Sequence, residues 1–130
     1  MKLRIVTPVR PVVDAEVSEL VAPGSEGEFG VLPEHVTFLG NLKPGVLSYT
    51  QGGNRQRVVI SGGYAEVRQD VLTMLVDDAE LPEEVDGAKA RADLARIQEE
   101  LARGNESAES TEKLLRSLAL AEARVSVSSR

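Results

Sequence analysis

Short apolar runs separated by strong turn signals fill the first two thirds of the chain. Pairs such as Pro23-Gly24 and Gly52-Gly53 supply the backbone geometries that tight turns need. Many short strands at close spacing predict a β-sandwich or barrel. The run Val58-Val59-Ile60 predicts a strand that is covered on both faces. The predicted strands cover residues 3–6, 17–22, 46–49, 58–60, 64–67 and 71–76.

After residue 84 the apolar spacing changes from that of strands to that of helices. Asp86 is placed to cap a first helix, and Gly104 with Asn105 is placed to end it. A second helix starts at Ser107 or Ser110. The inward face of the first helix is Ala90, Leu94, Ile97 and Leu101, and that of the second is Leu114, Leu118, Ala121 and Val125. Because these faces are rich in Ala, the predicted hairpin buries little apolar area and is only conditionally stable.

Composition divides the chain at the same place. Residues 1–84 hold all six prolines, nine of the eleven glycines and all four aromatic residues. They also carry the whole formal charge of −6, whereas residues 85–130 are charge-balanced and rich in strong helix formers. The predicted fold is therefore mixed β then α: an N-terminal β-sandwich domain, 1–84, followed by a C-terminal antiparallel two-helix hairpin, 85–130.

The chain offers few groups for chemistry. It has no Cys and a single His, so it provides no thiol nucleophile, no disulfide and no multi-histidine metal site. The adjacent acids Asp77 and Asp78 end a predicted strand, where acids are usually solvated. The acidic balance disfavours nucleic acid, and no apolar stretch reaches the roughly 20 residues of a membrane span. We therefore expect no catalytic residues, no metal, no nucleic acid, and membrane association only through partners.

Four motifs follow one another along the chain. Each alone is a Gly-rich turn or an ordinary strand. They are Gly-Ser-Glu-Gly-Glu-Phe-Gly-Val-Leu-Pro at 24–33 with His35 two positions on, Leu-Lys-Pro-Gly-Val-Leu at 42–47, Ser-Gly-Gly-Tyr-Ala-Glu-Val at 61–67, and Val-Leu-Thr-Met-Leu-Val-Asp-Asp-Ala-Glu at 71–80. In this order and at these spacings they resemble the ε subunit of the bacterial F-type, proton-translocating ATP synthase. The resemblance covers essentially the whole chain.

The resemblance implies a non-catalytic subunit of the central stalk, or rotor. Its β-sandwich would dock on the γ subunit and the ring of c subunits and help couple proton translocation to ATP synthesis. The loop that holds Glu28 matches the family position facing the c ring, and His35 matches a region near γ. The implied location is the cytoplasmic face of the bacterial inner membrane, peripherally, as part of the complex.

The resemblance also implies a role for the hairpin as a regulatory arm. In such proteins the arm can extend along γ into the α/β head and restrain ATP hydrolysis. Residues 113–130 carry a net charge of +3, and Lys113, Arg116 and Arg124 would meet acidic surface on β.

Some family members also bind ATP at the hairpin as a regulatory ligand. The matching residues here are Glu80, Asp86, Lys89 and Arg96. Lys89 stands where the family motif has Arg, and Ala119 stands near the position of a second-helix Arg. A Lys ammonium does not reproduce the planar fork of Arg. No obligatory cofactor is implied, and ATP is left open.

Two other functions remain as alternatives. The residues Glu80, Asp86, Lys89 and Arg96 around the junction allow an ATP-binding sensor that acts outside the synthase. The carboxylates alone motivate a small enzyme acting on carbohydrate or acidic substrates.

Overall fold

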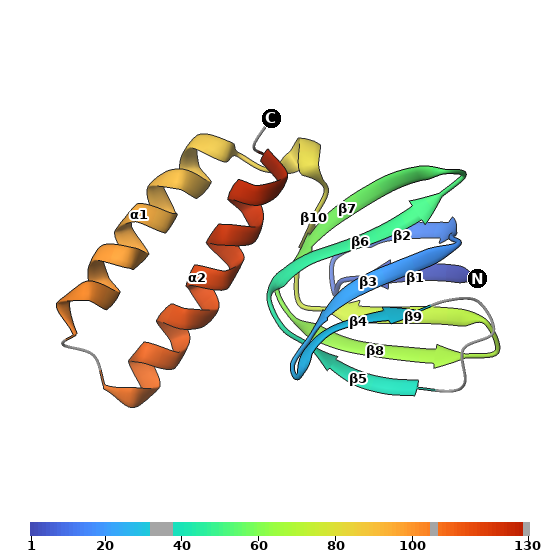
Figure 1. Ribbon diagram of the computed structural model, residues 1–130, viewed down its shortest axis with the longest axis horizontal. Coiled ribbons are helices and arrows are strands. Elements are labelled where there is room, and N and C mark those ends of the chain that lie inside the picture. Colours follow the sequence, from blue (N-terminus) through green and yellow to red (C-terminus); the bar gives the residue numbers. More distant parts are fainter. Residues whose placement is uncertain (32–37, 105–106, 129–130) are drawn as a thin grey trace.

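The computed structural model describes residues 1–31, 38–104 and 107–128, with a β-sandwich and a helical hairpin side by side (Figure 1). Helix α2 lies between helix α1 and the sandwich, so that only one helix of the hairpin packs on the sheet. This two-part arrangement confirms the predicted fold class. The boundary at residue 84 stays a prediction.

The sandwich is built from ten strands of a single sheet that folds over on itself. The strands are β1 (Lys2–Val6), β2 (Pro11–Glu16), β3 (Glu19–Gly24), β4 (Gly27–Val31), β5 (Phe38–Leu42), β6 (Gly45–Gln51), β7 (Asn54–Ile60), β8 (Gly63–Arg68), β9 (Val71–Val76) and β10 (Ala79–Glu80). Their order is β10-β7-β6-β3-β5-β8-β9-β1-β2, and β4 pairs with β3 outside this path. All pairs are antiparallel except β1 with β9.

The sequence pattern missed strands β2, β4, β5 and β10. Strands β2 and β10 lie at the two ends of the sheet, and β4 pairs only with β3. An edge strand needs no continuous apolar face, so its sequence can carry Pro, Gly and acidic residues that read as a turn. The segment containing Glu28 is accordingly a strand, β4, and the prediction of a loop there is wrong.

One apolar core fills the sandwich. Its members include Leu3, Leu47, Leu72 and Met74, each with no exposed surface. They come from β1, β6 and β9, which lie far apart in the sequence. The sheet therefore closes around residues that only the tertiary structure brings together.

The helices form where the spacing predicted them. Helix α1 spans Gly87–Arg103, and its N-cap Asp86 accepts a hydrogen bond from the backbone N–H of Lys89 at 3.1 Å. It ends at Gly104, whose φ of 68° is the left-handed conformation that closes helices. Helix α2 spans Ala108–Ser128. The hydroxyl of Ser107 accepts a hydrogen bond from the N–H of Ser110, so Ser107 is the residue that starts α2.

Helix α2 also has a second apolar face that the sequence did not predict. Ala123 and Val127 are buried against Val59, whose side chain points out of the sandwich. Val58 and Ile60, on either side of Val59, face the sandwich core. The prediction that 58–60 is covered on both faces is thereby confirmed, and the covering element is α2.

Candidate functional site

The hairpin of β3 and β4 presents Glu28 to solvent. Glu28 is exposed on β4 opposite Pro23. Gly24 shapes this end of the hairpin, because a Cβ there would lie 2.7 Å from the carbonyl oxygen of Gly27 and 2.8 Å from the Phe29 ring. The carboxylate is thus held on a strand that is hydrogen-bonded to β3. His35, the other residue predicted for γ or c-ring contact, lies outside the described residues.

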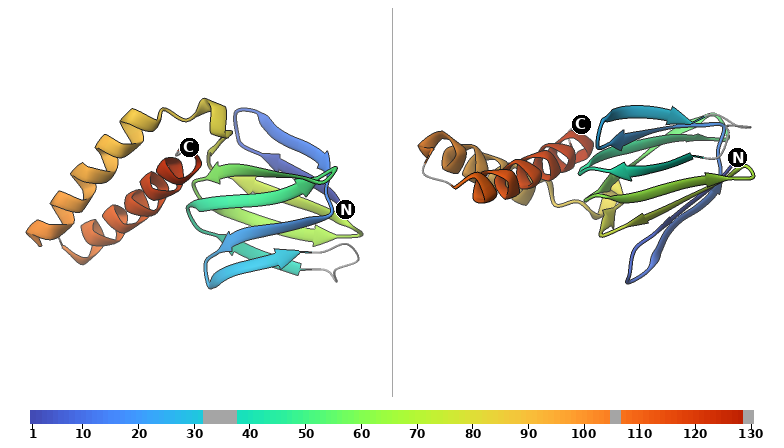
Figure 2. Two further views of the ribbon diagram at one scale, coloured as in Figure 1. Left: turned by 45° about the horizontal axis from the view of Figure 1, so that its top comes forward. Right: turned by 90° about the horizontal axis from the view of Figure 1, so that it is seen from below.

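A second exposed surface is apolar. Cross-strand pairing places Tyr64 of β8 opposite Leu75 of β9, and Leu75 opposite Val6 of β1. Tyr64 is 39% exposed and Leu75 is 55% exposed, while Val9 in the β1–β2 turn is 90% exposed. We call Val6, Val9, Tyr64 and Leu75 the apolar patch. The β1–β2 turn and the β3–β4 turn lie on opposite sides of the sandwich (Figure 2).

An ion pair joins the hairpin to the sandwich. Nε of Arg124 on α2 donates a hydrogen bond of 2.6 Å to Oε1 of Glu80 on β10. Both side chains are about three quarters buried, with 27% and 26% of their surface exposed. Arg124, predicted to contact the α/β head, is therefore engaged within the chain in this conformation.

A small pocket surrounds that ion pair. It has a volume of about 160 Å³ and is lined by Glu80, Asp86, Lys89, Ala90, Asp93 and Arg124. Three of the four residues predicted for ATP thus converge. Lys89 pairs with Asp93 at 3.0 Å, and this hydrogen bond lowers the pKa of the Asp93 carboxyl below its usual value. The pocket contains three acids against two cations, and both cations are paired.

Arg96, the fourth predicted residue, does not line this pocket. Its guanidinium pairs with Glu100 at 3.0 Å and lies 3.8 Å from Asp93. Sequence reasoning missed Asp93, although its position four residues after Lys89 places the two side chains together on one helix face.

The other cations of α2 lie on its exposed surface. Lys113 and Arg116 are exposed and make no ion pair within the described part of the chain. A guanidinium nitrogen of Arg116 lies 3.4 Å from where a Cβ on Gly62 would be, so this side chain reaches over the turn between β7 and β8. Of the three predicted head-contact residues, only Arg124 is therefore withdrawn from solvent.

A further ion pair ties the linker to the sandwich. Arg10 in the β1–β2 turn donates a hydrogen bond of 2.7 Å to Glu84 in the short 3₁₀ helix Pro82–Glu84. This bond lowers the pKa of Glu84 and raises the pKa of Arg10. The linker that leads into the hairpin is thus tied to the β1–β2 turn of the sandwich.

The described residues contain no cluster of three or more His, Cys, Asp or Glu side chains that could hold a metal ion. Among the helices that the structure describes, none is both long enough and apolar enough to cross a membrane.

The described residues thus form a β-sandwich followed by a two-helix hairpin (Figure 1), which is the architecture that the four motifs implied. Residues 1–82 match the family described as "ATP synthase, Delta/Epsilon chain, beta-sandwich domain". The match covers more than half of the chain. The chain belongs to the ATP synthase delta/epsilon family. The curated relatives that it matches are epsilon chains.

Those relatives are bacterial. The chain is 46% identical to the ATP synthase epsilon chain of Pelotomaculum thermopropionicum over 102 residues, which is 78% of this chain and 76% of the relative. It is 46% identical to that of Syntrophobacter fumaroxidans over 111 residues, 85% of this chain and 83% of the relative. These matches confirm the resemblance that the four motifs indicated.

Solved structures agree. A chain of the Euglena gracilis mitochondrial ATP synthase (OSCP, F1 and c-ring) superposes with a TM-score of 0.79 at 26% identity, covering 93% of this chain and 76% of the other. A chain of the Tetrahymena thermophila central stalk and c-ring gives 0.69 at 16% identity, covering 99% and 96%, which supports the fold alone. The protein is a non-catalytic, epsilon-type subunit of ATP synthase.

Proposed function

We propose that this subunit docks through its β-sandwich on γ and the c ring and restrains ATP hydrolysis through its helical hairpin. It would thereby help couple proton translocation to ATP synthesis. As part of that complex it would sit peripherally on the cytoplasmic face of the bacterial inner membrane.

Two surfaces suit the two docking partners. The β3–β4 hairpin would offer its exposed carboxylate, Glu28, to the c ring. The apolar patch, whose Val9 lies in the turn on the opposite side of the sandwich (Figure 2), suits burial against γ, because exposed apolar groups mark interaction sites. His35 remains a predicted contact.

The observation that supports the regulatory role is the small contact between the hairpin and the sandwich. Ala123 and Val127 of α2 are the fully buried side chains of this contact, and Leu120 of the same helix is partly buried beside them. Two polar contacts accompany them, the Glu80–Arg124 ion pair and the hydrogen bond from Arg57 to the carbonyl of Ser126. Burial of an Ala and a Val offsets little more than the entropy of ordering the contact. Lys113 and Arg116 are already exposed, and undocking would free Arg124 to join them at an acidic surface on the head.

Deletion of the hairpin tests the regulatory role. A subunit that lacks residues 87–130 should still co-purify with γ from native membranes, because both docking surfaces lie in the sandwich. The assembled complex should then hydrolyse ATP faster than the wild-type complex. Loss of γ binding with unchanged hydrolysis would contradict the proposal.

A reversible lock gives a sharper test. A Cβ on Gly87 would lie 3.1 Å from Cβ of Ser128, and a small shift brings this to the roughly 3.5–4.5 Å of a disulfide. The chain has no Cys of its own, so Gly87→Cys with Ser128→Cys would join the first residue of α1 to the last of α2. The disulfide holds the two helices together without tying them to the sandwich, so the oxidised complex should lose the restraint on hydrolysis if the arm acts by separating its helices, and reduction should restore it. The control is Gly87→Cys alone under the same oxidant, and a restraint that survives oxidation of the pair would refute separation of the helices in favour of undocking of the whole hairpin.

ATP as a regulatory ligand is the second candidate, because Glu80, Asp86 and Lys89 converge in one pocket. Its volume of about 160 Å³ lies below the roughly 300 Å³ at which ligand pockets begin, and its cations are already paired. Binding would therefore require the Glu80–Arg124 pair to open. Calorimetric titration of the isolated subunit with ATP tests this candidate. If millimolar ATP gives no heat of binding, with or without magnesium, both this candidate and the sensor that acts outside the synthase are excluded.

A further inference from the structure

A larger and separate pocket lies on the other side of the junction. It has a volume of about 600 Å³, which is within the range of small-ligand sites. It shares no residue with the pocket around Glu80. Its lining residues are Arg55, Gln56, Arg57, Pro82, Glu83, Val85, Gly87, Ala88, Arg91, Val127 and Ser128. Both parts of the chain therefore contribute to it.

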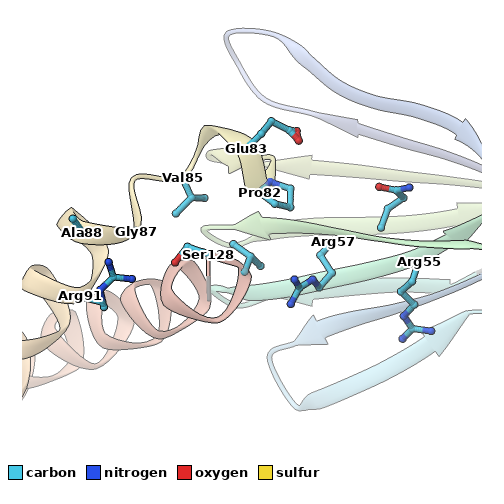
Figure 3. Close-up of a pocket in the computed structure, with 11 residues that line it drawn as sticks. Arg55, Arg57, Pro82, Glu83, Val85, Gly87, Ala88, Arg91 and Ser128 are labelled. Atoms are coloured by element: carbon cyan, nitrogen blue, oxygen red, sulfur yellow. The ribbon is translucent and has the colours of Figure 1, made fainter. Parts of the chain in front are cut away.

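Arginine dominates the charge of this pocket. Arg55 and Arg57 come from β7 and Arg91 from α1, against the single acid Glu83. Figure 3 shows Arg91 on one side of Ser128 and Arg57 on the other. An anion that lies across this pocket would meet guanidinium groups from the sandwich and from the hairpin at once.

Arg91 differs from the other cations of α1. Lys89, Arg96 and Arg103 each pair with an acid four residues away. Arg91 has Gly87 and Ala95 at those positions, and it makes no ion pair with any described residue. Its charge is thus not used to stabilise its own helix.

Arg57 is also free of an acidic partner within the described ranges. Its one hydrogen bond, of 3.5 Å, is to the backbone carbonyl of Ser126 on α2. Arg55 forms an ion pair with Glu19, with 3.2 Å between Nη1 and Oε1. Two unpaired guanidinium groups and a third that is partly neutralised leave the pocket with a positive charge that an anion can satisfy.

We infer that the pocket between β7 and α1 is a binding site for a small oligophosphate anion. Guanidinium groups form bidentate, charge-assisted hydrogen bonds with phosphate oxygens. Two such groups on either side of Ser128 suit an elongated anion with more than one phosphate better than a single phosphate. The apolar wall of Pro82, Val85 and Val127 excludes water from one side. The site goes beyond the proposed function, since it requires neither γ nor the c ring.

A ligand here would also hold the hairpin against the sandwich, because its contacts come from both. This consequence rests on the proposed function. It has its own readout in the isolated subunit, which is slower amide hydrogen exchange in the last turns of α2 when the ligand is present.

The test is calorimetric titration of the full chain with inorganic pyrophosphate, ATP and inorganic phosphate in low salt. Pyrophosphate should bind with a millimolar or tighter Kd, more tightly than phosphate, and more weakly at about 0.15 M salt. ATP that binds as well as pyrophosphate identifies a nucleotide as an acceptable source of the oligophosphate. ATP that binds much more weakly restricts the site to the inorganic anion.

Substitutions locate the site. Arg91→Ala and Arg57→Gln should each weaken pyrophosphate binding by about tenfold or more. Arg103→Ala, which removes another exposed cation of the same helix, is the matched control and should leave it unchanged. Arg91 is exposed, so its variant should fold normally. Absence of binding at about 10 mM pyrophosphate, or an equal loss in Arg103→Ala, would overturn the site. Binding without slower exchange in α2 would overturn only the link to docking, and a hairpin deletion that fails to raise hydrolysis would leave the site intact.

Discussion

The two regions of this subunit are stabilised in different ways. The sandwich buries large side chains from strands that are distant in sequence, such as Leu3, Leu47 and Leu72. The hairpin buries mainly Ala, with Ile97 as the one large buried residue of α1. Since stabilisation grows with the apolar area removed from water, the sandwich is a stable platform and the hairpin is an attachment of marginal stability.

Charge shows the same contrast. The ion pairs of α1 join residues three or four positions apart, as in Lys89–Asp93 and Arg96–Glu100. Such pairs stabilise a helix whether or not it is packed. Of the ion pairs described for the hairpin, Glu80–Arg124 alone reaches the sandwich. Undocking would therefore leave the ion pairs within α1 intact, as the movable arm proposed above requires.

The largest expected effect is on the sandwich core. Leu72→Ala should lower the free energy of unfolding by about 2–5 kcal/mol, because it leaves a cavity where no surface is exposed. Urea denaturation followed by tyrosine fluorescence measures this, since both tyrosines, Tyr49 and Tyr64, lie in the sandwich. The comparison is Ile97→Ala in the hairpin, which should leave that transition almost unchanged. Equal shifts in both variants would mean that the chain unfolds as one unit.

The next effect concerns the contact between the regions. Val127→Ala removes two methyl groups from the side chain that α2 buries against Val59, and should weaken docking by about 1–2 kcal/mol. Amide hydrogen exchange should then be faster in the last turns of α2 and unchanged in β7. Leu115→Ala, on the exposed side of the same helix, is the control. Faster exchange in both variants would show that α2 frays by itself and not by undocking.

A smaller effect is expected from the ion pair at the junction. Glu80→Gln should weaken docking by about 0.5 kcal/mol. The effect is small because solvent screens the attraction in a partly exposed ion pair, even at a separation of 2.6 Å. A double-mutant cycle with Arg124→Gln, read by the same exchange of α2, isolates the pairwise energy. Glu99→Gln, which breaks the pair with Arg103 on exposed α1, should not affect docking. A coupling energy of zero would assign the attachment to the apolar contact and to the hydrogen bond from Arg57 to the carbonyl of Ser126.

The smallest effect is electrostatic and local to α1. The hydrogen bond from Lys89 lowers the pKa of Asp93, so the carboxylate form favours the folded helix. Its contribution is complete above the pKa of Asp in an unfolded chain, about 3.9, and is lost as the pH falls through the lower folded value. Carbon NMR titration should show the pKa of Asp93 rising toward its ordinary value in Lys89→Ala. An unchanged value would assign the shift to Arg96 and Arg124.

The fold was predictable where the pattern is local. The spacing of Ala90, Leu94 and Ile97, the cap at Asp86 and the stop at Gly104 each depend on neighbours within one or two turns. The strands that were missed depend on pairing instead. Strand β4 carries Gly, Glu and Gly, and it is a strand because β3 supplies its hydrogen bonds.

The candidate sites divide in the same way. The motifs placed Glu80, Asp86 and Lys89 together, and the structure gathers them in one pocket. They could not show that Arg124 closes this pocket, because Arg124 lies 44 residues from Glu80 in the sequence. Nor could they reveal Arg57 and Arg91 in a second pocket, where one residue is on a strand and the other is on a helix.

By itself, the sequence determined the order of β then α, both ends of the first helix, the family, and the low apolar content of the hairpin. These follow from composition and from spacing along the chain. The tertiary structure decided which face of α2 meets the sandwich, which acid holds Arg124, and that arginines from two regions share one pocket. Those features depend on contacts between distant residues, whose side-chain chemistry is visible in the sequence but whose proximity is created only when the sheet closes and the hairpin docks on it.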